Sequence, residues 1–213
     1  MANILYDADT DITPLLTKQI AIIGYGSQGH AHALNLRDSG CHVCIGLPEQ
    51  SKSRQKAEQD GWSVLLPHEA AAQADVIMLL VPDQVAGDVY RQSILPQLSA
   101  GKLLLLAHGF ALHFGQIQPR EDIDVAMVAP NGPGVQLRHT YSIGAGIPAL
   151  WTICQDASGQ AQALTHAYAH ALGCTRVGII ETTLAEETET DLFAEQVVLC
   201  GGLVELIKGG YET

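Results

Sequence analysis

The stretch that decides the fold is IAIIGYGSQGHAHAL, residues 20–34. It opens with a short apolar run, which predicts a buried strand, and it continues into a run with helical character. Between them lie glycines at G-x-G-x-x-G spacing. Gly24 permits a tight turn, Gly26 lets the backbone approach a pyrophosphate, and Gly29 lets the helix lie close to the sheet. We favour dinucleotide binding over a chance glycine turn, and expect these residues to bind it: Gly24, Tyr25, Gly26, Ser27, Gln28 and Gly29.

Composition restricts the class of protein. The 213 residues suffice for one sizeable core, with room for a small second domain. The formal net charge of -12 argues against non-specific binding to nucleic acid or to an anionic membrane. No apolar run is long enough to cross a bilayer, and no secretory signal is visible. With five scattered cysteines, a reduced, cytoplasmic setting is the simpler expectation.

Two of the cysteines match C-x-x-C spacing, at Cys41 and Cys44. They fall within an expected strand, where residues three apart point to opposite faces. We therefore expect both to pack in the core, and disfavour a redox or zinc pair.

The chain alternates between strand and helix patterns, which predicts an α/β fold with a Rossmann-like, doubly wound, mostly parallel sheet. Residues 1–18 are expected to be an irregular lead-in with a short helical turn. Residues 1–181 would form the dinucleotide-binding domain and 182–213 the start of a second domain. Strands are expected at 20–23, 42–45, 64–65, 76–80, 103–106, 125–128, 149–155 and 177–180, the last ending the sheet. Helices are expected at 27–38, 53–60, 67–74, 82–92 and 158–172, the last capped by Ser158.

The loop after the second expected strand bears on the choice of cofactor. NAD enzymes usually place an acid at this strand end, whereas Glu49 lies well into the loop. Two hydroxyls and two cations follow it, and these groups suit the 2′-phosphate of NADP. They are Ser51, Lys52, Ser53 and Arg54. The alternative is a solvated loop in which Ser51 or Ser53 caps the next helix.

Further candidate residues follow the later strands. Ligand pockets in such sheets lie outside the carboxyl ends of the strands, where 81–83, 108–109 and 130–132 fall. Of these and their neighbours, we expect Pro82, Asp83 and Gly134 to contact the cofactor.

An acidic helix is expected from Thr183 onward, with Thr183 and Glu186 spaced as a capping box. Asp191 and Glu195 lie beyond its first turn, four residues apart, with Glu187 one turn earlier. Like charges at this spacing destabilise a helix by about 0.2–0.5 kcal/mol per pair. Such carboxylates could ligate Mg²⁺, a hard cation, but a solvated acidic face explains the spacing equally well.

Taken together, these motifs closely resemble ketol-acid reductoisomerase. The resemblance runs from about residue 6 to residue 213. The segments that carry it are GYGSQGHAHA (24–33), AHGF (107–110), AP (129–130), EETETDLF (186–193) and QVVLCGG (196–202).

The resemblance implies an enzyme of branched-chain amino acid biosynthesis. That family moves an alkyl group in a 2-acetohydroxy acid and reduces the resulting 2-keto acid with NADPH, to give a 2,3-dihydroxy acid. Two Mg²⁺ ions polarise the substrate oxygens. By match, Asp191 and Glu195 would be metal ligands, with Asp191 bridging both ions. His108 would be the active-site histidine near the nicotinamide, and Ser51 and Ser53 would hold the 2′-phosphate.

The chain departs from the family pattern at several positions. Pro48 stands where the family usually has Arg, Ala111 where it has Asn, and Ala194 where it has Gly. Asn131 replaces an active-site Lys. Asn131, Ala111 and the early end of the sequence favour two alternatives: a divergent NADPH reductase without isomerase activity, and a non-enzymatic nucleotide-binding or oligomerisation module. The intact pair of Asp191 and Glu195 favours the reductoisomerase.

The family continues into an all-helical, knotted domain, which supplies further metal carboxylates, usually to the partner subunit's site. The sequence here ends just inside that domain, at Thr213. Its last helix is apolar around much of its surface and needs burial. We expect a second copy to cover it, in a homodimer or larger homo-oligomer, or the sequence to be part of a longer enzyme. The apolar residues are Val197, Val198, Leu199, Leu203, Val204, Leu206 and Ile207.

Overall fold

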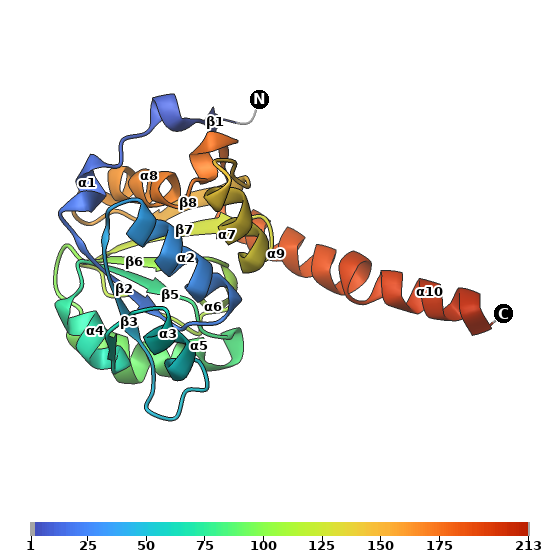
Figure 1. The fold of residues 1–213 in the computed structure, drawn as a ribbon, viewed down its shortest axis with the longest axis horizontal. Coiled ribbons are helices and arrows are strands. Elements are labelled where there is room, and N and C mark those ends of the chain that lie inside the picture. Colours follow the sequence, from blue (N-terminus) through green and yellow to red (C-terminus); the bar gives the residue numbers. More distant parts are fainter. Residues whose placement is uncertain (1–2, 213) are drawn as a thin grey trace.

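One mixed sheet organises the computed structural model, which describes residues 3–212 (Figure 1). Within these residues the sheet has nine strands, in the order β1-β9-β8-β7-β6-β5-β2-β3-β4. The six strands from β2 to β7 run parallel; β8 is antiparallel to β7, and β1 is antiparallel to β9. The strands are β1 (Ile4–Leu5), β2 (Gln19–Ile23), β3 (His42–Gly46), β4 (Val64–Leu65), β5 (Val76–Leu79), β6 (Leu103–Leu106), β7 (Asp124–Pro130), β8 (Ala149–Gln155) and β9 (Ile179–Glu181). The predicted Rossmann-like fold is confirmed.

Helices cover both faces of this sheet (Figure 1). The α-helices are α1 (Thr13–Leu16), α2 (Ser27–Asp38), α3 (Arg54–Gln59), α4 (Pro67–Gln73), α5 (Asp83–Val89), α6 (Phe110–His113), α7 (Gly134–Ser142), α8 (Ala161–Ala171), α9 (Leu184–Phe193) and α10 (Gly202–Glu212). Short 3₁₀ segments are η1 (Asp7–Asp9), η3 (Leu95–Gln97) and η4 (Cys174–Arg176), and π-helical segments are η2 (Tyr90–Ile94) and η5 (Ala194–Leu199).

The core divides into two layers because successive strand residues point to opposite faces. In β5, Val76 and Met78 pack with residues of α1, α2, α3, α7 and α8. Ile77 and Leu79 pack with residues of α4, α5, η2 and α6. All four residues of β5 are buried, as a strand covered on both faces requires.

The C-x-x-C cysteines follow the same rule. Cys41 belongs to one core layer and Cys44 packs against the other. Both thiols are free. The prediction of core packing is confirmed.

The strand order reverses beside β2, and this positions the site. After β2 the chain adds β3 and β4 on one side, then returns to add β5 on the other. The register pairs Ile23 with Leu79, and Leu79 with Leu106. The carboxyl ends of β2, β5 and β6 are therefore level with one another, and a crevice opens at this switch point.

The ends of the sheet differ from the prediction. The lead-in is not wholly irregular, because Ile4 and Leu5 form β1 and pair with β9. Thus β1 is the edge strand, and β9 lies inside the sheet between β1 and β8. The sequence did not mark β1, because it precedes the alternation of strand and helix patterns that predicted β4, a strand of the same length.

Ser158 does not cap the helix that follows it. The helix α8 begins at Ala161 with Gln160 as its N-cap. The Ser158 hydroxyl instead donates to the buried carboxylate of Asp124, 2.5 Å away. The expected helix at 82–92 also differs, because α5 ends at Val89 and continues as the π-helical segment η2.

The C-terminal helix stands away from the layered part of the molecule (Figure 1). Its apolar side chains are exposed, including Leu203 at 50%, Ile207 at 65% and Tyr211 at 92%. Within residues 3–212, no helix combines the length and apolarity needed to cross a membrane.

Candidate functional site

A cavity of about 1160 Å³ opens at the switch point. Its walls come from the glycine turn, the loop after β3, the ends of β5, β6 and β7, and the segment from α9 to η5. Most predicted site residues line it: Gly24, Tyr25, Gly26, Ser27, Gln28, Ser51, Ser53, Pro82, Asp83, His108, Asp191 and Glu195.

Two predicted site residues, Gly29 and Gly134, are absent from this lining. A Cβ at Gly29 would overlap the Gly24 carbonyl, and one at Gly134 would overlap the Ser27 carbonyl. Both glycines therefore act on the site through packing. Gly29 lets α2 lie against the sheet, and Gly134 lets the start of α7 lie against the glycine turn.

In the turn between β2 and α2, packing within the protein explains why residue 24 is glycine but not why residue 26 is. Gly24 has φ +108°, and a Cβ there would overlap the Leu80 carbonyl, so the turn out of β2 requires glycine. At Gly26 an added Cβ would have no atom of residues 3–212 within 4 Å. Gly26 precedes the free backbone N–H groups that begin α2. This open cradle fits a pyrophosphate.

The loop after β3 contributes only two of its four candidate residues. Ser51 and Ser53 line the cavity, whereas Lys52 and Arg54 do not. Ser53 occupies the N-cap position of α3, but its hydroxyl makes no capping hydrogen bond. The alternative role of Ser53 as a side-chain cap is therefore wrong.

The Arg54 guanidinium is bound elsewhere. It donates to the carbonyls of Val64 and Leu47, at 3.3 and 3.4 Å, and lies 3.6 Å from the Glu58 carboxylate. The prediction that Arg54 binds the 2′-phosphate of NADP is not supported. Its guanidinium instead joins β4 to the residue that follows β3.

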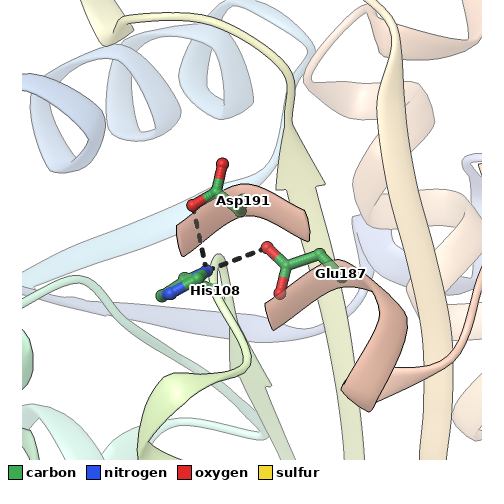
Figure 2. Close-up of side chains that lie close together, drawn as sticks. All are labelled: His108, Glu187 and Asp191. Carbon is green, nitrogen blue, oxygen red and sulfur yellow. Dashed lines mark hydrogen bonds and ion pairs between the residues drawn. The ribbon is translucent and has the colours of Figure 1, made fainter. Parts of the chain in front are cut away.

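At the other end of the cavity, His108 meets two carboxylates of α9 (Figure 2). His108 Nδ1 lies 3.0 Å from Glu187 Oε1 and 3.4 Å from Asp191 Oδ2. The second oxygen of Glu187 accepts a hydrogen bond from the Gly109 N–H at 2.9 Å. Glu187 therefore holds both the ring and the backbone of the loop after β6, while its own side chain is only 4% exposed.

This close approach depends on Gly109. A Cβ there would overlap the Thr188 hydroxyl, which is itself tied to the Leu184 carbonyl at 2.7 Å. The loop can reach α9 only without a side chain at this position. The amino end of α9 is fixed by Thr183, whose hydroxyl accepts from the Glu186 N–H at 3.1 Å. Only this half of the predicted capping box forms, since the Glu186 carboxylate accepts from the Thr182 hydroxyl instead.

The electrostatics of this cluster favour a cation. The hydrogen bond to Glu187, aided by the charges of Glu187, Asp191 and Asp83, raises the pKa of His108 against the effect of burial. Burial raises the pKa of Asp191, and the charges of Glu195, Glu187 and Asp83 add to this, opposed by His108. Crowded carboxylates are harder to ionise, and a bound cation relieves that penalty.

The cluster offers a set of metal donors. One donor atom from each of His108, Glu187 and Asp191 lies within 4.8 Å of the others. Glu195 lines the same cavity from η5 but lies outside this set. The two carboxylates suit a hard cation such as Mg²⁺ or Mn²⁺, whereas the imidazole is more typical of Zn²⁺ or Fe²⁺. The i, i+4 spacing to Asp191 singles out Glu187 in the sequence, but only Asp191 and Glu195 were predicted as ligands. The bonds from Glu187 to His108 and Gly109 were not predicted.

The cavity lining is strongly acidic. Asp83, Glu187, Asp191 and Glu195 line it, and among residues 3–212 no lysine or arginine does. The positions that depart from the family pattern also border this space: Pro48, Ala111, Asn131 and Ala194. An anionic ligand would therefore need the backbone N–H groups of the glycine turn, or a bound cation, to offset this charge.

Family models cover most of the chain. Residues 14–178 match the acetohydroxy acid isomeroreductase, NADPH-binding domain, model. Residues 184–213 match the ketol-acid reductoisomerase, C-terminal domain, model.

Solved structures agree with these matches. An NADH-preferring ketol-acid reductoisomerase from an uncultured archean is 46% identical, with a TM-score of 0.95. The match covers 99% of this chain and 65% of that one, so this chain spans about two thirds of that relative's length.

More distant structures share the fold alone. A semialdehyde dehydrogenase NAD-binding protein from Cupriavidus necator is 20% identical, with a TM-score of 0.76 over 92% of this chain and 74% of that one. Pyrroline carboxylate reductase from Plasmodium falciparum is 18% identical, with a TM-score of 0.61 over 91% and 66%. The two family models and the relative that is 46% identical show that the chain belongs to the ketol-acid reductoisomerase family.

Proposed function

We propose that this chain forms the dinucleotide- and Mg²⁺-binding part of a ketol-acid reductoisomerase that acts in branched-chain amino acid biosynthesis. The reaction would be alkyl migration in a 2-acetohydroxy acid, followed by reduction to a 2,3-dihydroxy acid. One observation carries the proposal: a single cavity joins the open cradle at Gly26 to the cluster of His108, Glu187 and Asp191. A hydride donor and a metal-bound substrate need to meet in such a space.

The cofactor would lie along the carboxyl ends of the strands. The N–H groups at the start of α2 would bind its pyrophosphate, and Pro82 and Asp83 would border the half nearer the nicotinamide. When bound there, the cofactor would supply the hydride of the reduction. Leu79, Leu106 and Ala129 give this part of the cavity apolar walls, which exclude water from the reacting atoms.

Ser51 and Ser53 support NADPH, since both residues line the cavity. The absence of a lysine or arginine from its lining within residues 3–212 supports only weak discrimination against NADH. We propose that NADPH is bound less than about tenfold more tightly than NADH, a difference of about 1.4 kcal/mol.

Mg²⁺ would be held by Asp191 and Glu195, with Glu187 and His108 close by. When bound, Mg²⁺ polarises the substrate oxygens and stabilises their negative charge. Glu187 accepts at His108 Nδ1, and this fixes the ring so that Nε2 can exchange a proton with a substrate hydroxyl.

Two further features belong to the proposal. The domain boundary would lie near residues 181–183, where β9 gives way to α9. The exposed apolar face of η5 and α10 would pack against a second copy of the chain, in a homodimer or larger assembly.

Steady-state assays with two substrates test the proposed reaction. With Mg²⁺, we expect the chain to oxidise NADPH in the presence of 2-acetolactate. Reduction of 3-hydroxy-3-methyl-2-ketobutyrate without any turnover of 2-acetolactate would instead support the reductase alternative, which Asn131 and Ala111 favour. If Mg²⁺ affects neither turnover nor cofactor binding, the proposed role of the metal is wrong.

A further inference from the structure

A hydrogen-bonded network braces the outer side of the glycine turn. The side chain of Tyr25, which lies between Gly24 and Gly26, is 3% exposed. Its hydroxyl donates to Asp60 Oδ2 at 2.9 Å and accepts from Trp62 Nε1 at 2.8 Å. Both partners come from the segment just after α3, which is far from the turn in sequence.

Asp60 also contacts the other side of the G-x-G-x-x-G motif. Its Oδ2 lies 3.4 Å from His30 Nε2, in the first turn of α2. Its backbone carbonyl accepts from the Arg37 guanidinium at 2.9 Å, and that guanidinium stacks over Trp62, 4.8 Å from the ring centre. One carboxylate is therefore shared by the middle of the glycine turn and the helix that follows.

The inner side of the turn is fixed in a different way. There Gly24 packs directly against the Leu80 backbone. Gly26 itself has no neighbour among residues 3–212 around its open side. The direction of the N–H groups near Gly26 thus depends on backbone packing on one side and on the bond between Tyr25 and Asp60 on the other.

The helix α3 connects the hydrogen-bonded network of Tyr25 and Asp60 to the loop after β3, which is proposed to bind the adenosine ribose. Ser51 and Ser53 lie at its amino end, and Arg54 ties that end to the Leu47 carbonyl. Asp60 lies at its carboxyl end. The elements proposed to bind the pyrophosphate and the adenosine ribose are therefore held by opposite ends of one short helix.

We propose that Asp60 is a positioning residue of the dinucleotide site, whose carboxylate holds the glycine turn in its binding geometry through the Tyr25 hydroxyl. The inference rests on the dinucleotide site of the proposed function. Asp60 does not touch the cofactor; it fixes the groups that do, so that less order has to be gained on binding.

The test is the equilibrium Kd of NADPH and NADH for the 213-residue chain and four variants, measured well below each melting temperature. Asp60→Ala should raise Kd by about tenfold or more, and Tyr25→Phe, which loses only the hydroxyl, by about three- to tenfold. Asp60→Asn, whose amide oxygen can still accept from Tyr25, should stay within about threefold of wild type. Gln55→Ala changes an exposed site on the same helix and should leave Kd unchanged.

A double-mutant cycle separates positioning from general loosening of the fold. Adding Tyr25→Phe to Asp60→Ala should raise Kd by much less than Tyr25→Phe does alone, because the bond between the two residues is already gone and only the bond from Trp62 is left to lose. Additive effects would overturn the proposal, as would wild-type Kd values for both single variants. If Asp60→Ala does not fold, Tyr25→Phe and Asp60→Asn decide the matter. A wild-type chain that binds neither cofactor would overturn the dinucleotide site itself, and with it this inference.

Discussion

At the scale of single residues, Glu187 is the side chain that joins α9 to the loop carrying His108. One of its oxygens accepts from the His108 ring and the other from the Gly109 N–H. Glutamine has the same shape but only one acceptor oxygen, so Glu187→Gln either loses one of these bonds or keeps both by donating to His108 Nδ1, which moves the ring proton to Nε2. We expect turnover to fall by about 10- to 100-fold, while the Kd of NADPH changes by less than about threefold.

Glu189→Gln is the matched control for this change. Glu189 lies on the same helix with 70% of its side chain exposed, 3.4 Å from His113. Turnover of this variant should be close to wild type. Equal losses in the two variants would show that the charge of α9, and not the contact with His108, matters.

His32 provides a residue-scale prediction about pH. It is fully buried, its Nδ1 lies 3.0 Å from the Tyr168 hydroxyl, and its Nε2 has no partner among residues 3–212. Burial lowers the pKa of His32 to about 3. Because the unfolded state takes up this proton first, the stabilisation is complete above about pH 6.5 and is lost as pH falls toward 3.

Urea unfolding across this range measures the effect. The His32 contribution should fall by up to about 1.4 kcal/mol for each pH unit below 6.5. His32→Gln should flatten this part of the stability curve relative to wild type, whereas His42→Gln, at an exposed position, should not. Parallel curves for wild type and His32→Gln would contradict the account.

For single residues, the sequence predicted a role correctly where the role depends on backbone geometry. It failed where the role depends on the direction in which a side chain points. Spacing alone assigned Gly24 and Gly29 their packing roles, because only glycine fits those approaches. Spacing could not show that Arg54 turns away from the cavity. Its partners, the carbonyls of Leu47 and Val64, come together only when β3 and β4 pair.

At the scale of elements, two glycines of the unit formed by β2, the turn and α2 have different roles: Gly29 is needed for folding, and we propose that Gly26 is needed for binding the cofactor. Gly26→Ala adds a methyl group that meets no atom of residues 3–212, at an ordinary φ of -78°. We expect its free energy of unfolding to stay within about 1 kcal/mol of wild type, while the Kd of NADPH rises by about tenfold or more.

Gly29→Ala is the opposite case. Its methyl group would overlap the Gly24 carbonyl, so it should lower the free energy of unfolding by about 1–3 kcal/mol or more. Urea unfolding and cofactor titration on both variants check the pair. A Gly26→Ala protein that binds NADPH as wild type does would argue against a pyrophosphate at this turn.

Helices and strands were predicted most accurately where the sequence pattern is long and regular. The fully buried β5 was found closely because a continuous apolar run is typical of a strand covered on both faces, and α2 was found because it directly follows the glycine motif. The two-residue β1 and four-residue α6 were not predicted. They form because tertiary neighbours, β9 and α9, supply their partners.

At the scale of the whole molecule, α10 is the feature that its own chain does not cover. Its exposed apolar side chains include Leu203 and Ile207. We expect the chain to be a dimer or larger in solution, and the double variant Leu203→Lys/Ile207→Lys to lower its molecular mass toward that of one chain. Light scattering after size exclusion measures this, with Glu205→Gln as the control. A monomeric wild-type chain would contradict the proposed contact.

Dinucleotide and metal are proposed to share one cavity, and a titration of NADPH into the chain, with and without Mg²⁺, tests this most directly. We predict saturable binding with a Kd between about 1 µM and 1 mM, and tighter binding with Mg²⁺, because the cation offsets the four acids of the lining. Asp191→Asn should weaken the Mg²⁺ effect and leave binding without Mg²⁺ intact. No binding of NADPH or NADH under either condition would contradict the account.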